Sequence, residues 1–197
     1  MSRPLLADLT PANAVDKLAA LFEAIAGTSY LGEPVTIAEH MLQAAAWARR
    51  DGASDELIAA ALLHDVGYYA DPNPDNANES DRAKRHDAVA ARVLSAVFPP
   101  DVTEPIRLHV DAKRYLCAVE PDYRERLSAA SIHTMRLQGG VMSREEAASF
   151  AAEPYCEDAV RLRHWDDEGK EPDAEVPGFA SHRALLEGLV RDVRNAP

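Results

Sequence analysis

The chain has 197 residues, of which 47% are hydrophobic and 6% aromatic, and its formal net charge at pH 7 is −12. This length suits one substantial core better than two independent ones, and an apolar fraction dominated by alanine favours packed helices. The negative charge argues against a nucleic-acid-binding surface, which needs clustered Lys and Arg, and no apolar run approaches the roughly 20 residues of a membrane span.

The chain is predicted to begin with a scaffold helix followed by a loop. Apolar residues recur at helical spacing over residues 15–25, and Gly27 marks the expected end of that helix. The loop over residues 28–36 contains helix-breaking residues and carries Tyr30 and Glu33. Its composition favours a lid over a linker.

Two further helices bring the first histidines. The helix predicted over residues 36–50 places His40 on nearly the same side as its apolar residues. The next helix starts near Ser54, is rich in Ala and Leu, and delivers the pair His64-Asp65 before an expected stop at Gly67. Burying a carboxylate there costs several kcal/mol unless a positive group meets it, which a metal ion would do. A simple buried His-Asp hydrogen bond is the alternative.

The middle of the chain is predicted as a loop followed by two helices. Residues 71–80 are polar and rich in Asn and Pro, which indicates an exposed loop. A helix is predicted from near His86 to the prolines at positions 99 and 100, so that His86 lies at its loop-facing end.

The segment after these prolines resembles a helix N-terminus. Asp101 and Glu104 match a capping box in which Asp replaces Ser or Thr, and the helix that follows carries His109 and Lys113. These two residues are four apart and share a face. On spacing alone, Lys113 fits a solvated surface charge as well as an anion-binding group.

The rest of the chain is predicted as short helices. They are expected over residues 122–131, from Ser143 with Glu146 in capping-box register, over residues 155–167, and from Ser181 onward, with a turn at residues 137–140. Arg163 and Asp166 share one helical face. No segment alternates enough to predict a strand, so we expect an all-α fold. It forms one domain over residues 1–197, with a core over about 15–170 and a C-terminal helix over about 181–194.

The cellular compartment is inferred from two features. The N-terminal stretch lacks the long apolar core of a secretory signal. Cys117 and Cys156 are better interpreted as reduced thiols than as a disulfide. We therefore expect a cytoplasmic protein that binds neither nucleic acid nor membranes, whereas the oligomeric state is not set by the sequence.

The histidines and aspartates described above form one pattern along successive helices. The candidate metal ligands are His40, His64, Asp65, His86, His109 and Asp166. Imidazole and carboxylate ligands suit iron, manganese or zinc, and six of them exceed what one ion needs beside a substrate. The pattern therefore predicts two metal ions.

The order His, His-Asp, His, His, Asp on successive helices resembles the HD-domain superfamily in its two-metal form. Within it, the chain looks closest to the small mixed-valent di-iron oxygenases of the PhnZ and TmpB type, which cleave the carbon–phosphorus bond of 1-hydroxyalkylphosphonates. The lid segment YLGE (30–33), Lys113, the segments LSAAS (127–131) and LQGG (137–140), and RLRHWDD (161–167) carry this closer match. The resemblance spans about residues 18–170.

The resemblance implies a role for each matching position. One iron would be held by His40, His64 and Asp166 and the other by His86 and His109, with Asp65 bridging; the choice of Asp166 over Asp167 rests on register alone. Tyr30 resembles a residue that occupies an iron position until substrate arrives, and Glu33 its hydrogen-bonding partner, which later meets the amino end of the substrate. Positions expected to bind the phosphonate are Lys113, Ser131 and Arg163, with Ser128 as a weaker candidate and Gln138 nearby.

One position departs from the family. Members commonly read HDIGH where this chain has HDVGY, so Tyr68 replaces a histidine expected on the phosphonate side of the pocket. A phenol donates one hydrogen bond but does not become cationic near neutral pH, so the pocket is expected to be less positive or differently shaped.

The resemblance implies a dioxygenase with two iron ions, Fe2+ and Fe3+, that needs no organic cofactor. Its expected substrates are O2 and a 1-hydroxy-2-aminoethylphosphonate or the N-methylated analogue, giving glycine or glycine betaine and phosphate. Two alternatives stay open: a metal-dependent HD-domain phosphohydrolase acting on a small phosphate ester, and a non-catalytic HD-fold regulator that binds a phosphorylated small molecule.

Overall fold

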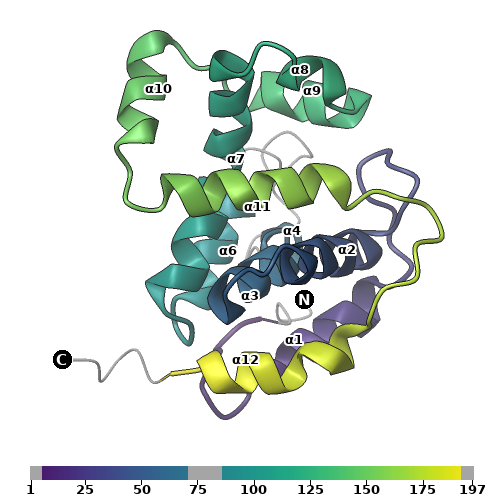
Figure 1. Cartoon of the computed structure of the whole chain (residues 1–197). Helices are drawn as coiled ribbons and strands as arrows, with labels where there is room; N and C mark the ends of the chain where they lie inside the picture. The colour runs from purple at the N-terminus through teal and green to yellow at the C-terminus, as the bar shows by residue number, and fades with distance from the viewer. Residues whose placement is uncertain (1–5, 71–85, 192–197) are drawn as a thin grey trace.

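The computed structural model describes residues 6–70 and 86–191, and these residues form a bundle of helices (Figure 1). The helices are α1 (Ala14–Ile25), α2 (Ile37–Arg50), α3 (Asp55–Leu63), α4 (Gly67–Ala70), α6 (His86–Leu94), α7 (Pro100–Val119), α8 (Tyr123–Arg126), α9 (Ala129–Leu137), α10 (Arg144–Ala151), α11 (Cys156–Glu168), the 3-10 helix η2 (Phe179–His182) and α12 (Arg183–Leu189). Within the described ranges there is no strand beyond an isolated bridge between Ser29 and Thr36, so the all-α prediction is confirmed. The loop predicted at residues 71–80 lies outside the described residues.

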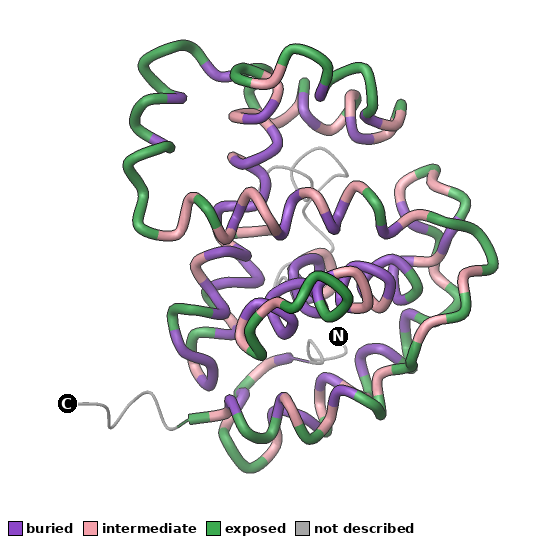
Figure 2. The backbone as a smooth tube through the Cα atoms, in the orientation of Figure 1, coloured by how far each residue is buried: buried purple, intermediate pink, exposed green. Residues whose placement is uncertain are grey.

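Helix α3 is the centre of the bundle. All its residues from Leu57 to Leu63 are buried, as expected of a helix that is apolar on every side. It packs on α2 and α7, and α11 lies across both of these helices (Figure 1). Buried residues line α2, α3 and α7 where these helices pack together (Figure 2). Because α2, α7 and α11 carry candidate ligands, and His64 and Asp65 directly follow α3, the main core and the candidate site share the same scaffold.

A smaller part of the molecule lies over the C-terminal half of α7. Two minor apolar clusters form there, one around Leu108 and Phe150 and one around Leu116 and Tyr123. They hold helices α8, α9 and α10 (Figure 1). The single-domain organisation stays a prediction.

Several helix starts follow the sequence signals. Ser54 caps α3 by accepting the amide of Leu57, and Ser143 forms the expected capping box with Glu146. A second capping box, Thr36 with Glu39 at the start of α2, was present in the sequence but not among our predictions. It fixes the first turn of the helix that carries His40.

Three predicted starts or spans were wrong. The capping box at Asp101 does not form, because α7 begins one residue earlier at Pro100 and Asp101 lies inside its first turn. The helix predicted over residues 122–131 is two helices, since Ser128 caps a separate helix α9. Ser181 lies within η2 and does not cap α12.

Gly67 does not end a helix as predicted. Helix α3 already ends at Leu63, and Gly67 is the first residue of α4. A Cβ atom at Gly67 would lie 1.8 Å from the carbonyl oxygen of His86 and 2.9 Å from the amide of Ala90. The glycine is therefore required because α4 and α6 approach each other backbone to backbone. Helix α6 in turn ends at Leu94, short of the predicted boundary at the prolines.

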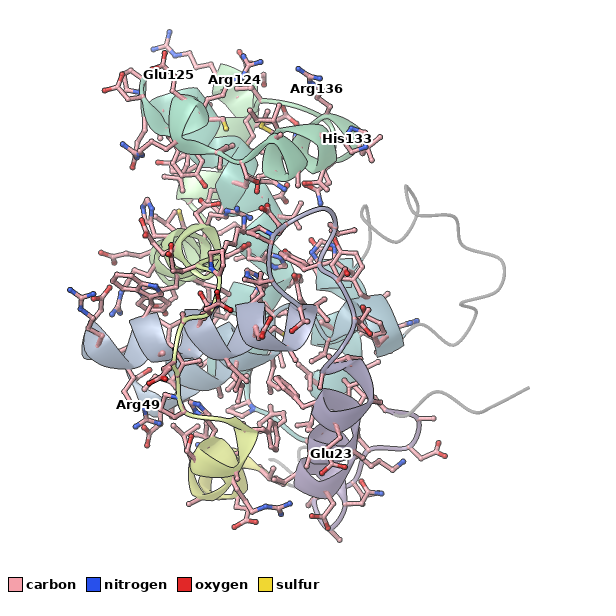
Figure 3. The ribbon with its side chains drawn as sticks, turned by 90° about the vertical axis from the view of Figure 1, so that its right-hand side faces the viewer. Glu23, Arg49, Arg124, Glu125, His133 and Arg136 are labelled. Atoms are coloured by element: carbon pink, nitrogen blue, oxygen red, sulfur yellow. The ribbon has the colours of Figure 1, made fainter. Side chains whose placement is uncertain are left out.

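Charged side chains gather on the outside of the bundle. Glu23, Arg49, Arg124 and Arg136 are exposed and point away from their helices (Figure 3). Among the described helices, none is long and apolar enough to cross a membrane.

Candidate metal centre

The four candidate histidines come from four different elements and converge on Asp65. His40 lies in the first turn of α2, His64 directly follows α3, His86 opens α6, and His109 lies midway along α7. Asp65 lies in the turn between α3 and α4, at the negative end of the α3 dipole, which favours cations. All five side chains are at least 96% shielded from solvent, since the most exposed of them, His86, shows 4%.

The first cluster consists of His40, His64 and one oxygen of Asp65. The two Nε2 atoms lie 3.0 Å apart, and Asp65 Oδ2 is 3.7 Å from His40 Nε2 and 3.6 Å from His64 Nε2. These three atoms form a group with the geometry needed to hold one metal ion.

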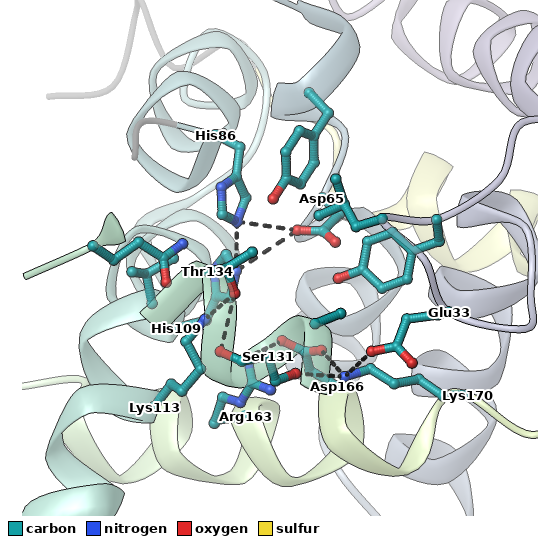
Figure 4. A pocket seen from close by; sticks show the side chains of 16 residues that line it. Glu33, Asp65, His86, His109, Lys113, Ser131, Thr134, Arg163, Asp166 and Lys170 are labelled. Atoms are coloured by element: carbon teal, nitrogen blue, oxygen red, sulfur yellow. Dashed lines mark hydrogen bonds and ion pairs between the residues drawn. The ribbon is translucent and has the colours of Figure 1, made fainter. Parts of the chain in front are cut away.

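The second cluster uses the other oxygen of the same carboxylate. Asp65 Oδ1 is 3.2 Å from His86 Nε2 and 3.7 Å from His109 Nε2, and these two nitrogens are 3.1 Å apart. The three residues form a second group able to hold an ion. Asp65 therefore lies between the two groups with one oxygen directed at each, as a bridging ligand would. Figure 4 shows the side of Asp65 that faces His86 and His109.

Hydrogen bonds from Nδ1 fix the ring orientation of three of the four histidines. The Nδ1 atoms of His40, His64 and His109 donate to the carbonyls of Gly169, Ala61 and Ile106 at 2.9, 2.8 and 2.7 Å. Their Nε2 atoms are then left with lone pairs directed at the centre, which is how metal-binding histidines are held. Burial lowers the pKa of His40 to about 4 and that of His109 well below its usual value, so these rings stay neutral and able to coordinate.

Buried polar atoms without partners show that a cation fits here. Asp65 Oδ2 and Asp166 Oδ1 are buried and accept no hydrogen bond from any residue that the structure describes. Burial opposes ionisation of Asp65, but His64 and the other histidines around it outweigh burial and hold its pKa well below the usual range. A buried anion facing the lone pairs of His40 and His64 is costly without a positive ion between them.

Asp166 rather than Asp167 faces the first cluster. Asp166 Oδ1 is 3.4 Å from His40 Nε2, and its Oδ2 is 4.0 Å from His64 Nε2. Asp167 instead accepts hydrogen bonds from Tyr123 and Arg163. The geometry thus shows which of the two adjacent aspartates faces the cluster, a choice that the sequence supported only through helical register.

Arg163 is the main cation beside this carboxylate. Its Nη1 donates to Asp166 Oδ2 at 2.5 Å, and its Nε donates to the Tyr123 hydroxyl at 3.1 Å. Arg163 lines the pocket next to the metal centre, as expected, but its guanidinium is already engaged by Asp166 and Asp167.

The predicted lid closes over the first cluster. Leu31 and Gly32 both have positive φ, and the amide of Glu33 donates to the carbonyl of Tyr30 at 2.7 Å, which is the pattern of a tight type I′ turn. The turn stacks the Tyr30 ring on His40, with centroids 4.2 Å apart. Burial raises the pKa of Tyr30 well above its usual value, and Asp65 adds to the effect, so the phenol stays protonated.

Glu33 is held by Ser128, the weaker of the predicted phosphonate-binding candidates. The Ser128 hydroxyl donates to Glu33 Oε1 at 2.5 Å and accepts the amide of Ser131 as the cap of α9. Ser128 thus joins the lid to α9, and both of its hydrogen bonds are to protein groups.

Tyr68 plays the same part at the second cluster that Tyr30 plays at the first. Its ring stacks on His86 with centroids 4.3 Å apart, and it lines the pocket. Burial raises its pKa well above the usual value. Each cluster therefore has one histidine covered by a neutral tyrosine.

The far wall of the pocket is formed by Lys113, Ser131, Gln138 and two residues that the sequence analysis missed, Thr134 and Lys170. Lys113 Nζ donates to Thr134 Oγ1 at 3.1 Å, and Lys170 Nζ donates to Ser131 Oγ at 3.0 Å (Figure 4). Lys170 lies four residues after Asp166, just past the end of α11 at Glu168, and this spacing was the available signal.

The pocket is nearly filled by its own side chains. Its cavity is about 20 Å³, which leaves room for about one water molecule. A phosphonate therefore enters only if a lining side chain moves.

Comparison with known proteins agrees with this geometry. An HD domain family model matches residues 37–166, which includes all six candidate ligands. The chain belongs to the HD domain family.

Two similar proteins are named as phosphonate dioxygenases. The chain is 40% identical to a 1-hydroxy-2-(trimethylamino)ethylphosphonate dioxygenase of Leisingera caerulea that forms glycine betaine, over 96% of this chain and 97% of that protein. It is 42% identical to a hydroxymethylphosphonate dioxygenase of Gimesia maris, over 89% of each chain.

Proposed function

We propose that this protein is a di-iron dioxygenase that cleaves the carbon–phosphorus bond of a 1-hydroxyphosphonate. The observation that carries the proposal is Asp65, whose two oxygens face two separate histidine pairs beside a pocket lined by lysines. The activities named for the two dioxygenase relatives support it.

The proposed ligand assignment follows the two clusters. One ion would be held by His40, His64 and Asp166 and the other by His86 and His109, with Asp65 as the carboxylate available to both. Histidine with carboxylate, and positions left open for substrate, suits non-haem iron. When bound, the Fe2+/Fe3+ pair supplies the redox chemistry by which O2 oxidises C1 of the substrate.

The chain's own residues bind and orient the substrate in this proposal. Lys113 and Ser131 hold the phosphonate, since an ammonium and a hydroxyl suit its oxygens. Arg163 acts from behind Asp166, fixing the ligand and adding positive charge. Tyr30 covers His40 in the absence of substrate, and this cover excludes water and prevents unproductive oxidation. When substrate arrives, Tyr30 moves aside to admit it.

The substrate end opposite the phosphonate faces the lid. Glu33 is the carboxylate available to a 2-amino group, and the neutral rings of Tyr30 and Tyr68 can contact a methylated ammonium. We therefore propose 1-hydroxy-2-aminoethylphosphonate or its N-methylated analogue as substrate, with glycine or glycine betaine and phosphate as products. We propose cytoplasmic action on these small molecules, with no nucleic-acid or membrane partner.

The test combines metal analysis with turnover. Protein purified without oxygen should contain two iron ions per chain and show a mixed-valent electron paramagnetic resonance signal that changes when a 1-hydroxyphosphonate is added. O2 uptake and phosphate release should accompany each other. His86→Ala should lose iron and activity, whereas His133→Ala, an exposed histidine on α9, should keep both.

A different outcome would favour hydrolysis. Stoichiometric zinc, no resonance signal, and release of phosphate from phosphate esters without O2 uptake would contradict the proposal. They would identify a phosphohydrolase instead.

A further inference from the structure

Lys170 lies where the lid, the phosphonate wall and the metal centre meet. Its Nζ is 3.0 Å from Ser131 Oγ, 3.6 Å from Glu33 Oε1 and 3.8 Å from Asp166 Oδ1. Figure 4 shows its side chain reaching between these groups from the end of α11. The side chain is only 11% exposed, so its charge is poorly screened by water.

Glu33 therefore already has a cation beside it. Its carboxylate is 9% exposed and receives the Ser128 hydroxyl in addition to facing Lys170. A substrate ammonium placed on Glu33 would lie close to the Lys170 ammonium, and like charges at such short range repel each other. A substrate without an amine meets no such repulsion.

We infer that Lys170 is a specificity-determining residue that opposes Glu33. The carboxylate attracts substrates with a cationic amine, Lys170 partly cancels that attraction, and the balance between them sets the preference for cationic over neutral 1-hydroxyphosphonates. This inference rests on the proposed function and names the residue pair that selects among its substrates.

The test compares two substrates in four proteins. We would measure kcat/KM for the trimethylammonium compound and for hydroxymethylphosphonate in the parent protein, Lys170→Met, Glu33→Gln and the double variant. Lys170→Met loses a cation near the phosphonate and should lower kcat/KM for both compounds. The cationic-to-neutral ratio should nevertheless rise about fivefold, the size expected for one partly shielded charge pair.

The other variants separate this role from a structural one. The rise in the ratio should largely disappear when Glu33 is replaced by Gln, because the ammonium is then no longer held next to Lys170. Lys170→Arg retains the charge and should retain the parent ratio. An equal loss for both compounds in Lys170→Met, with the ratio unchanged, would overturn the inference.

Failure of the proposed function would look different. If the iron-loaded parent protein turned over neither compound, the proposed function would fail. Calorimetric binding of the two compounds to the same four proteins would then decide the inference by the same ratio. Absence of binding to all four would overturn it.

Discussion

At the scale of single residues, the centre is defined by which side-chain atoms remain able to bind a metal ion. The Nδ1 atoms of His40, His64 and His109 donate hydrogen bonds to backbone carbonyls, so each ring has only Nε2 available to a metal. Asp65 has two oxygens and directs one at each histidine pair. A substitution such as Asp65→Asn would remove the negative charge that faces both histidine pairs, so it would weaken both proposed metal positions and not only one.

At the same scale, the ionisation of Lys113 predicts how kcat/KM depends on pH. Burial lowers its pKa to about 7, with Arg163 adding to the effect and Asp166 and Asp167 opposing it. The ammonium is present below that pH and is lost as the pH rises through it. Phosphonate binding by the free enzyme should weaken accordingly, and kcat/KM should fall about fivefold from pH 7 to pH 8.

The control for this prediction is a cation that does not titrate in this range. Lys113→Arg should move the alkaline loss of kcat/KM to higher pH, because a guanidinium stays charged. Lys170→Arg should leave it in place. Identical pH profiles for the parent protein and Lys113→Arg would show that another group is responsible.

At the scale of elements, the site depends on close approach between backbones. Gly67 lets α4 pass against α6, and a Cβ at Gly169 would lie 3.0 Å from the carbonyl oxygen of His40. Gln43 reinforces the second approach by hydrogen bonding both the amide and the carbonyl of Glu171 at 2.9 Å. These contacts place His86 and the end of α11 against the metal centre.

Gly67→Ala tests this dependence. The added Cβ would collide with backbone atoms of His86 and Ala90, which are not free to rotate away, so α6 must shift. We expect a loss of about 2 kcal/mol or more in the free energy of unfolding and reduced iron at the His86 cluster. Denaturant unfolding and metal analysis measure the two effects.

Gly27→Ala is the matched control, because among the described residues nothing lies within 4 Å of its Cβ position. It should leave iron content and stability within about 0.5 kcal/mol of the parent. An Ala at position 67 that preserved both would mean that α6 does not depend on this contact.

How far the sequence predicted these elements depends on how local the signal is. Ser54 and Ser143 cap their helices as expected, because a hydroxyl reaching an amide three residues on is a local interaction. The contacts of Gly67 with His86 and of Lys170 with Ser131 join residues that are 19 and 39 positions apart, and periodicity contains no information about them. Residue types at the centre were foreseen, whereas the choice of Asp166 over Asp167 needed the packed helix.

At the scale of the whole molecule, the bundle concentrates an unfavourable set of groups in its interior. Asp65, Asp166 and four imidazoles are buried together on the helices that also form the main core. Arg163 compensates Asp166 on one side, but within the described ranges the Asp65 oxygen facing His40 and His64 has no hydrogen-bond donor. The fold therefore retains strain that bound cations relieve.

Removal of the metal should lower stability for this reason. Each ion held at a thousand times its dissociation constant stabilises a fold by about 4 kcal/mol, which for a chain of this size corresponds to a fall in Tm of about 10 °C for each ion removed by chelation. Differential scanning calorimetry of the iron-loaded protein, the chelated protein and the chelated protein resupplied with iron or zinc measures this. Either metal should restore most of the Tm, because charge compensation does not require redox chemistry, while only iron should restore O2 uptake. A Tm unchanged after verified loss of metal would show that the fold satisfies its buried carboxylates without bound cations, which would contradict this prediction.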